Sequence, residues 1–337
     1  MGNALKDLGK LEEAIEAYNK ALYIIPDYAK VIENAASLRN QISETALINE
    51  EFNKQLKIDS LELLEMPKFQ IYQAINAFLL NEKKAVHKHL KNYNACSSSL
   101  IAKLKVKDQL FCSAYNNFLQ KLIEIPLQNA ATFADNRSVF HIGESHCLSY
   151  AHNKIKLQGV DYTVAPRITF GGKAYHFSLK KEDAFKAITK ANFYNLPTGS
   201  KVFVSFGEID CRPNEGIISA TSKLGKTIEN IVSETVEGYV GWFVKQNKSK
   251  NHSLFFFNVP APVYDEKYTI EVNKKVKSII KLYNSFLNKT VFDYNLNVID
   301  VYKFTVGHDE FSNGYFHIDG RHLSSDAIPE IEKQIGT

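Results

Sequence analysis

Hydrophobic and polar positions change their period about two fifths of the way along the chain. From residue 136 onward, short apolar runs alternate with longer segments of helical spacing, whereas the residues before it have helical spacing throughout. The apolar runs are typical of buried β-strands, and they cover Val139–Gly143, Tyr162–Ile168, Lys201–Phe206, Leu254–Val259 and Val298–Val301. Helices are predicted between and after these runs, at Leu148–Leu157, Lys181–Asn192, Thr227–Lys245, Val272–Leu287 and Ser325–Ile335.

Strands that are apolar throughout and separated by helices indicate a parallel sheet covered on both faces. We therefore expect residues 136–337 to form a flavodoxin-like, three-layer α/β/α sandwich with a five-stranded parallel sheet. In such folds a ligand binds beyond the carboxyl ends of the strands, near the point where the strand order reverses. Functional side chains are accordingly expected just after each strand.

The part of the chain before residue 136 predicts an all-α region in two parts. In residues 1–60, apolar positions recur at helical spacing, with a turn residue at Gly9 and a closing Pro26. Residues 61–135 predict further amphipathic helices separated by proline and serine positions. We expect this second part to link the first one to the α/β domain.

The first 60 residues resemble a tetratricopeptide repeat. Gly9, Ala14, Tyr18, Ala21 and Pro26 are similar to that motif's turn glycine, small packing residues, aromatic residue and closing proline. A degenerate second copy follows at a spacing of about 34 residues, the length of this repeat. Because three or more repeats are usually needed for stability, the segment is expected to be either a truncated array or a capping stub, and we favour truncation. The resemblance implies a protein partner bound by these helices.

Composition and charge exclude several classes of function. Hydrophobic residues make up 45% of the 337 positions, an ordinary globular share, and the 41 basic residues are scattered among 37 acidic ones. No basic face for a nucleic acid is indicated, and no run approaches the ~20 apolar residues of a membrane span. The four cysteines lack metal-ligand spacing. We expect no metal, no cofactor and a reducing, cytoplasmic location.

Candidate chemistry lies after the first strand and near the end of the chain. Ser145 stands in Gly143-Glu144-Ser145-His146, where a following helix N-terminus favours a developing negative charge. Asp319 and His322 are three positions apart, so the carboxylate can hold the imidazole in one tautomer. The other ring nitrogen is then free to take the proton of Ser145, which is a poor nucleophile without such a base. Taken alone, Ser145 would be a helix N-cap, and the order Ser, Asp, His favours catalysis.

These residues resemble the SGNH, or GDSL-type, hydrolase family from about residue 138 to the end. Gly143-Glu144-Ser145 is similar to the family's Gly-Asp-Ser block, with glutamate in place of aspartate, and Asp319 to His322 is similar to its Asp-x-x-His block. The resemblance implies Ser145 as nucleophile, His322 as base and Asp319 as the residue that orients it.

Two further segments are similar to the remaining blocks of that family. Phe170-Gly171-Gly172 looks like the glycine block, which implies oxyanion donors at the N–H groups of Ser145, Gly171 and Gly172. Gly207-Glu208-Ile209-Asp210 resembles the Gly-x-Asn-Asp block, but Ile209 replaces the asparagine whose amide donates to the oxyanion. Losing one such donor typically costs about 10²–10³ in rate.

Several explanations of this departure stay open. The backbone donors suffice, or Arg212, Asn258 or another group replaces the amide, or hydrolysis is weak and the reaction differs. Glu144, Gly207 and Asp210 are expected to support the site, with the two carboxylates fixing loops by accepting backbone N–H bonds.

Two classes of function follow from these residues. The first is an esterase that acts on a small acyl ester, with acetylated glycans as the substrates that the resemblance implies, or an O-acyltransferase to a glycan hydroxyl. The second is a binding or scaffold protein with tetratricopeptide helices, in which Ile209 marks a hydrolase-like domain of weak turnover.

Overall fold

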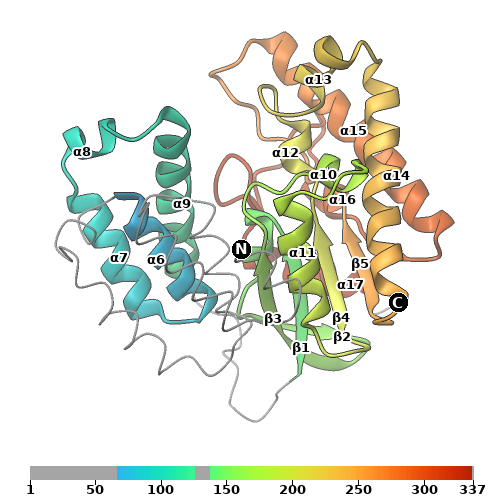
Figure 1. Ribbon diagram of the computed structural model, residues 1–337, viewed down its shortest axis with the longest axis horizontal. Helices are drawn as coiled ribbons and strands as arrows, with labels where there is room; N and C mark the ends of the chain where they lie inside the picture. Colours follow the sequence, from blue (N-terminus) through green and yellow to red (C-terminus); the bar gives the residue numbers. More distant parts are fainter. Residues whose placement is uncertain (1–66, 126–136, 336–337) are drawn as a thin grey trace. The chain divides into compact units, whose positions relative to one another are not determined.

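The computed structural model describes residues 67–125 and 137–335 (Figure 1). The chain divides into two compact units, residues 1–126 and 127–337. The boundary predicted at residues 135 and 136 falls between the two described parts. The tetratricopeptide helices predicted in residues 1–60 also lie outside the described residues.

The described part of the first unit is helical, as predicted. Helix α6 packs against both α7 and α9 and buries Ile71, Ala74 and Ile75 on one face, while α9 buries Phe118 and Leu119. This is the amphipathic packing that helical spacing of apolar residues produces. The helices are α6 (Pro67–Leu79), α7 (Lys83–Ala95), α8 (Ser98–Ala102) and α9 (Val106–Glu124).

The described part of the second unit contains one sheet with the strand order β2-β3-β1-β4-β5-β6. All its neighbouring strands are parallel except the edge pair β2–β3. Numbered by themselves, the parallel strands follow the order 2-1-3-4-5, which confirms the predicted flavodoxin-like arrangement. The strands are β1 (Ser138–Gly143), β2 (Lys154–Leu157), β3 (Val160–Ile168), β4 (Lys201–Ser205), β5 (Ser253–Phe257) and β6 (Asn297–Ile299).

The antiparallel edge strand corrects the helix predicted over Leu148–Leu157. That segment is instead the end of a short 3₁₀ helix, η1 (Ser145–Leu148), followed by a turn and by β2. Ile155 and Leu157 in β2 are buried and alternate with more exposed lysines, which is the period of a strand. Gln158 and Gly159 have φ angles of 54° and 79°, the left-handed conformations of a tight hairpin turn. The hairpin turn therefore determines the local structure, and the helical spacing of the apolar residues does not.

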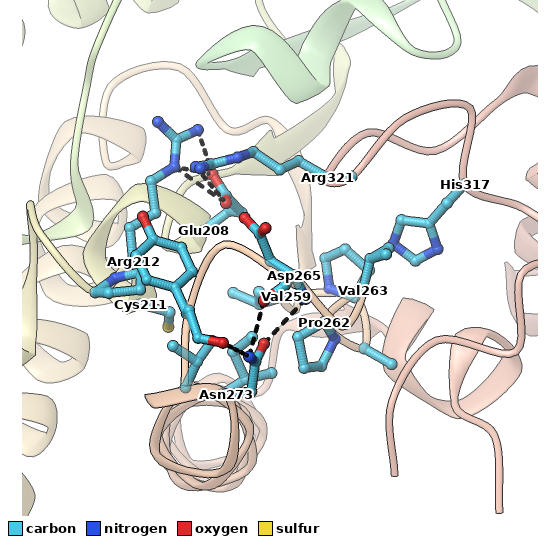
Figure 2. A pocket seen from close by; sticks show the side chains of 17 residues that line it. Glu208, Cys211, Arg212, Val259, Pro262, Val263, Asp265, Asn273, His317 and Arg321 are labelled. Atoms are coloured by element: carbon cyan, nitrogen blue, oxygen red, sulfur yellow. Dashed lines mark hydrogen bonds and ion pairs between the residues drawn. The ribbon is translucent and has the colours of Figure 1, made fainter. Parts of the chain in front are cut away.

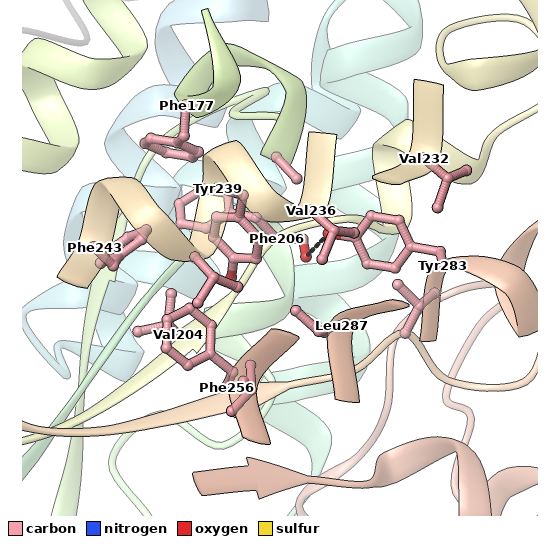
Figure 3. Close-up of a cluster of buried hydrophobic side chains, with 14 of the residues drawn as sticks. Phe177, Val204, Phe206, Val232, Val236, Tyr239, Phe243, Phe256, Tyr283 and Leu287 are labelled. Atoms are coloured by element: carbon pink, nitrogen blue, oxygen red, sulfur yellow. Dashed lines mark hydrogen bonds between the residues drawn. The ribbon is translucent and has the colours of Figure 1, made fainter. Parts of the chain in front are cut away.

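Helices cover both faces of the sheet, as predicted. One face meets α10, α11, α14 and α15 in an aromatic-rich core that includes Tyr239, Phe243 and Tyr283 (Figure 3). The other face meets α17 and the segment before it, through Leu323 and Ile331. The helices of this unit are α10 (Ala174–Ser178), α11 (Ala184–Tyr194), α12 (Glu208–Cys211), α13 (Ile217–Leu224), α14 (Ile228–Asn247), α15 (Ile270–Asp293), α16 (Val301–Thr305), η2 (Ser325–Ala327) and α17 (Ile328–Ile335).

The carboxyl ends of β1 and β4, which are neighbours in the sheet, each run into a short helix, η1 and α12. The predicted site residues are concentrated at these two ends and in the segment before α17. No helix within the described ranges has the length and apolar character needed to cross a membrane.

Candidate active site

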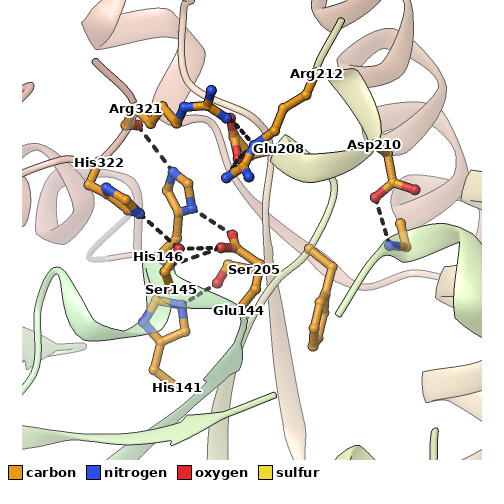
Figure 4. A network of polar contacts seen from close by, with 12 residues as sticks. His141, Glu144, Ser145, His146, Ser205, Glu208, Asp210, Arg212, Arg321 and His322 are labelled. Carbon is orange, nitrogen blue, oxygen red and sulfur yellow. Dashed lines mark hydrogen bonds and ion pairs between the residues drawn. The ribbon is translucent and has the colours of Figure 1, made fainter. Parts of the chain in front are cut away.

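Ser145 and His322 meet at the carboxyl edge of the sheet, although they are 177 positions apart. The Oγ of Ser145 lies 2.8 Å from Nε2 of His322 (Figure 4). Nδ1 of His322 lies 2.8 Å from Oδ2 of Asp319. Because an ionised carboxylate only accepts hydrogen bonds, Nδ1 carries the proton and Nε2 faces the serine hydroxyl as an acceptor. The structure therefore brings the three predicted residues into one hydrogen-bonded chain.

A small loop with its own anchor holds the aspartate and the histidine. His317 and Leu323 form an antiparallel bridge, and the buried side chain of Leu323 fixes the loop to the core. Oδ1 of Asp319 accepts the backbone N–H groups of Arg321 and His322 at 2.8 and 2.7 Å. The carboxylate thus orients the imidazole while its second oxygen holds the loop backbone.

The surroundings set both side chains in the charge states that base catalysis requires. Burial lowers the pKa of His322 below its ordinary value of 6.5, more than the hydrogen bond to Asp319 raises it. Burial alone would raise the pKa of Asp319, but the bonds from His322 and from the backbone hold that pKa well below its usual range. The pair is therefore a neutral imidazole beside a carboxylate at neutral pH, which is the form that accepts a proton.

Ser145 has a second short contact, which the sequence did not suggest. Its Oγ donates to Oε2 of Glu144 at 2.7 Å, and Oε1 of Glu144 lies 2.6 Å from Nδ1 of His146. Nε2 of His146 donates to the backbone carbonyl of Arg321 at 3.1 Å. Glu144 and His146 are 1% and 8% exposed. A buried Glu–His pair thus lies beside the hydroxyl of Ser145, in addition to the contact of that hydroxyl with His322.

The Glu144–His146 pair is charged. Burial opposes the charged form of His146, but the adjacent carboxylate raises its pKa to about 9. Burial likewise opposes the charge on Glu144, and His146 nevertheless holds its pKa below the usual value. The only sequence signal for this pair is that glutamate and histidine flank the serine directly.

A second, partly buried glutamate, Glu208, ties α12 to the loop of His322. The carboxylate of Glu208 accepts Nε of Arg212 at 2.8 Å, and its other oxygen lies 3.4 Å from Nη1 of Arg321. Burial would raise the pKa of Glu208, but the two guanidinium groups lower it to about 2. The predicted site residue Arg212 is therefore held by a carboxylate, with its fork already occupied.

Asp210 holds the glycine segment that follows β3. Its two oxygens accept the N–H groups of Ala174 and Tyr175 at 2.8 and 3.0 Å. The N–H of Gly172 donates to the carbonyl of Thr169 at 3.0 Å, so the donor expected at Gly172 is already engaged in a turn. The N–H groups of Gly171 and Ser145 have no hydrogen-bond partner among the described residues.

The remaining predicted residues lie in structural positions. The amide of Asn258 donates to Asp300 at 2.7 Å and accepts the N–H of Tyr302 at 3.1 Å, so it joins the end of β5 to α16. Ile209 is 5% exposed. Gly207 has φ 129°, and a Cβ there would lie 2.5 Å from the ring of Tyr283. Within the described ranges, none of these side chains supplies the amide that Ile209 lacks.

Glu208 and Arg212 also line a pocket (Figure 2), whose lining includes neither Ser145 nor His322. Its volume of about 80 Å³ is well below the ~300–1,000 Å³ of pockets that enclose drug-sized ligands. Apolar side chains from the segment after β5 form one wall, while Arg321 and His317 line the pocket from the loop of His322. The apolar residues are Val259, Pro260, Ala261, Pro262 and Val263.

Other chemistry finds little support at this edge of the sheet. Cys147 and Cys211 are buried, and burial raises the pKa of each thiol well above its usual value, so neither is a thiolate at neutral pH. Across the part of the chain that the structure describes, no group of three or more His, Cys, Asp or Glu side chains is arranged to hold a metal ion.

Comparison with known proteins gives one family match and several similar structures. Residues 1–28 match the tetratricopeptide repeat family, which agrees with the resemblance noted from the sequence. Among curated proteins, none matches the chain.

Three similar structures cover between 58% and 71% of this chain. A Streptococcus pneumoniae protein provisionally assigned as a platelet activating factor is 14% identical to this chain, with a TM-score of 0.43. The match covers 71% of this chain and 97% of that chain. A GDSL-like lipase from Bacteroides thetaiotaomicron is 15% identical, with a TM-score of 0.41, 66% of this chain and 94% of that one covered. An acetyl xylan esterase is 13% identical, with a TM-score of 0.37, and the match covers 58% of this chain and 96% of that one. At these identities and scores, what the neighbours do does not carry over to this chain.

Proposed function

We propose that the α/β unit is a serine esterase that cleaves the oxygen ester of a small acyl group. The observation that carries this proposal is the chain of two 2.8 Å contacts from Ser145 through His322 to Asp319. A nucleophile, a base within hydrogen-bond reach and a carboxylate that orients the base are the three parts of serine acyl transfer.

The reaction follows from the positions of these groups. Oγ of Ser145 bonds to the ester carbonyl carbon as its proton passes to Nε2 of His322, and Asp319 stabilises the resulting imidazolium. Collapse of the tetrahedral intermediate breaks the bond to the leaving oxygen, which takes the proton from His322. A water then attacks the acyl-enzyme with His322 as base again, and the acid and the free serine are released. A sugar hydroxyl in place of water would give O-acyl transfer.

The oxyanion of the intermediate needs hydrogen-bond donors, and Ile209 cannot supply the side-chain amide that an asparagine at its position would. The unpaired N–H groups of Ser145 and Gly171 are the donors that we assign to it. Asp210 supports this role because it fixes the backbone just after the glycine segment to α12. With two donors rather than three, the rate is expected to be lower than that of an enzyme with the amide, by about 10²–10³.

The neighbouring pocket supports a small acyl group on a polar carrier. Its volume suits an acetyl-sized group better than a long chain, and its apolar wall after β5 favours the hydrocarbon part. Arg321, His317, Asp265 and Tyr268 give the remaining lining polar character, as a carbohydrate or another hydroxylated carrier would require.

Turnover of p-nitrophenyl acetate by the purified chain and by Ser145→Ala tests this function. The wild type should release p-nitrophenol at a rate that the variant does not approach, and equal rates would refute the proposal. Adding a glycan acceptor separates the two reactions, because a transferase yields acylated sugar while an esterase yields only acetate.

The tetratricopeptide match favours an additional function for the N-terminal part. Repeats of this family stack to form extended concave binding surfaces, so we propose a protein partner for residues 1–60. A chain that only binds partners would show the same background turnover in the wild type and in Ser145→Ala. The two functions are compatible, since the match lies outside the α/β unit.

A further inference from the structure

The hydroxyl of Ser145 makes two short contacts but carries a single proton. Its Oγ lies 2.7 Å from Oε2 of Glu144 and 2.8 Å from Nε2 of His322. At such distances each contact needs a hydrogen between the two atoms. When His322 is neutral, its Nε2 has no proton, so the serine proton can lie on only one of the two contacts at a time.

The contacts of His146 determine which atoms of the Glu144–His146 pair carry protons. Nε2 of His146 must be protonated, since a backbone carbonyl accepts from it. One more proton lies in the 2.6 Å contact between Nδ1 of His146 and Oε1 of Glu144. His146 holds that proton, so both members are charged and the pair, an imidazolium beside a carboxylate, is neutral overall. Oε2 is left without a proton and faces Ser145 as an acceptor.

We propose that Glu144 is a second acceptor for the proton of Ser145, and that His146 positions this carboxylate and balances its charge. The inference rests on the proposed function because it concerns the same nucleophile. When His322 is protonated, the serine donates to Glu144 and Nε2–H of His322 donates to Oγ, so both contacts are satisfied. When His322 loses that proton, the serine hydroxyl turns from Glu144 to His322 and becomes ready for attack.

This arrangement gives each member of the pair a definite effect on His322. The carboxylate of Glu144 accepts the serine proton and so stabilises imidazolium at position 322. The positive charge of His146 opposes it, because the two imidazole rings lie tilted against each other with centroids 4.7 Å apart. The two effects have opposite signs, and they partly cancel in the intact protein.

Other charged and titratable groups face the same cluster and must stay constant in a test. Asp319 and His317 face His322 from its own loop. Glu144 is faced by groups from β1, η1, α12, α14 and that loop. These are His141, Cys147, Glu208, Arg212, Tyr239 and, from the loop, His322 itself.

The titration of His322 tests the proposal without any turnover. The full chain is labelled with ¹⁵N-histidine, and the ring signals of His322 are identified by their loss in His322→Gln. In Glu144→Gln the midpoint should fall by about one pH unit, the lower end of the effect of an opposite charge within ~4–6 Å. In His146→Gln it should rise, because a positive charge has been removed.

Opposite shifts in the two variants would support the proposal, since disruption of the site would move both midpoints in the same direction. An unchanged midpoint in Glu144→Gln, or shifts of the same sign, would overturn it. Glu234→Gln, an exposed site on α14 that pairs with Lys226, controls for the change of net charge.

Circular dichroism confirms that each variant is folded. Should Glu144→Gln fail to fold, His146→Gln decides alone: a rise supports the proposal, and no change or a fall overturns it. Failure of the proposed function is seen separately, as p-nitrophenyl acetate turnover that does not depend on Ser145. That result would leave the titration of His322 unaffected.

Discussion

Two strand ends in this sheet carry closely similar residues with different consequences. After β1 the chain reads Gly143-Glu144-Ser145-His146, and after β4 it reads Gly207-Glu208-Ile209-Asp210. The strands are parallel neighbours, and each glutamate stands at the start of a short helix. Both glycines are required by packing, because a Cβ at Gly143 would lie 2.2 Å from Oγ of Ser205 and one at Gly207 would strike a tyrosine ring.

The difference lies in the residue after the glutamate and in the glutamate's partner. Glu208 is bound by two arginines and has a pKa of about 2, so its charge is fixed and it serves as a tie between elements. Glu144 is bound by a histidine and by the Ser145 hydroxyl, both of which exchange protons. Closely similar backbone at the two strand ends therefore supports proton transfer only at the end where the side chains that contact the glutamate can gain or lose a proton.

The largest effect is expected from moving the nucleophile between the two ends. Ser145→Ala should lower kcat/KM for p-nitrophenyl acetate by about 10⁴-fold or more, because the triad acts as a unit. Adding Ile209→Ser in that background should restore nothing, since His322 faces position 145. Recovered turnover in the double variant would show that the two ends are interchangeable, and circular dichroism checks that it is folded.

A smaller effect is expected from releasing the glycine segment at the second end. Asp210→Ala removes the acceptor of two backbone N–H groups, so the donor at Gly171 is held less firmly. We expect kcat to fall by roughly 10–100-fold, below the full loss of an oxyanion donor, with KM little changed.

Steady-state kinetics on Asp300→Ala give the matched control for this prediction, because Asp300 accepts the backbone N–H of Lys303 as the cap of α16, after β6, with β1, β4 and β5 between β6 and β3 in the sheet. Equal losses in the two variants would mean that Asp210 contributes only stability.

The fixed charge at the second end predicts a pH-dependent stability. The pKa of Glu208 is lowered in the folded state, so its contribution is present above pH ~4.5 and is lost as the pH falls toward 2. Glu208→Gln should cost roughly 3 kcal/mol at neutral pH, because the two guanidinium groups lower the pKa of the carboxyl from 4.5 to about 2 and each pKa unit corresponds to about 1.36 kcal/mol.

Thermal unfolding of the wild type and Glu208→Gln across this pH range measures the difference. The gap between the two melting temperatures should close between pH ~4.5 and 2. A gap that is the same at pH 3 and pH 7 would show that the carboxylate's charge contributes nothing.

The smallest effect is expected on the low-pH side of the kcat/KM profile, which depends on His322 beside the end of β1. The base must be neutral, and burial lowers the pKa of His322, so the limb moves to lower pH. The kcat/KM profile should have its acid midpoint below the ordinary histidine value of 6.5. A midpoint above 6.5 would mean that the charge of Glu144 and Asp319 outweighs burial.

The parallel core and the meeting of the three site residues followed from the sequence for a physical reason. Apolar strands separated by helices have few alternatives to a parallel sheet, and parallel strands bring their carboxyl ends to one edge. Ser145 and His322 could be placed together on that basis, whatever lies between them. The hairpin at Gln158 and Gly159 was missed because its two-residue turn outweighs the helical spacing before it.

Side-chain directions were harder to foresee than positions. The contact of Glu144 with the Ser145 hydroxyl depends on a rotamer that sequence spacing does not fix. The use of the Gly172 N–H in a turn depends on the local backbone of residues 169–172. The pairing of Glu208 with Arg212 was predictable, since opposite charges four apart on a helix are neighbours.

The reactivity of Ser145 toward a fluorophosphonate probe tests the central claim most directly. We expect one probe per chain on Ser145, found by mass spectrometry of the digested protein, and labelling slower by about 10²-fold or more in His322→Gln. A folded wild-type chain that stays unlabelled, or one that labels equally fast without His322, would contradict it.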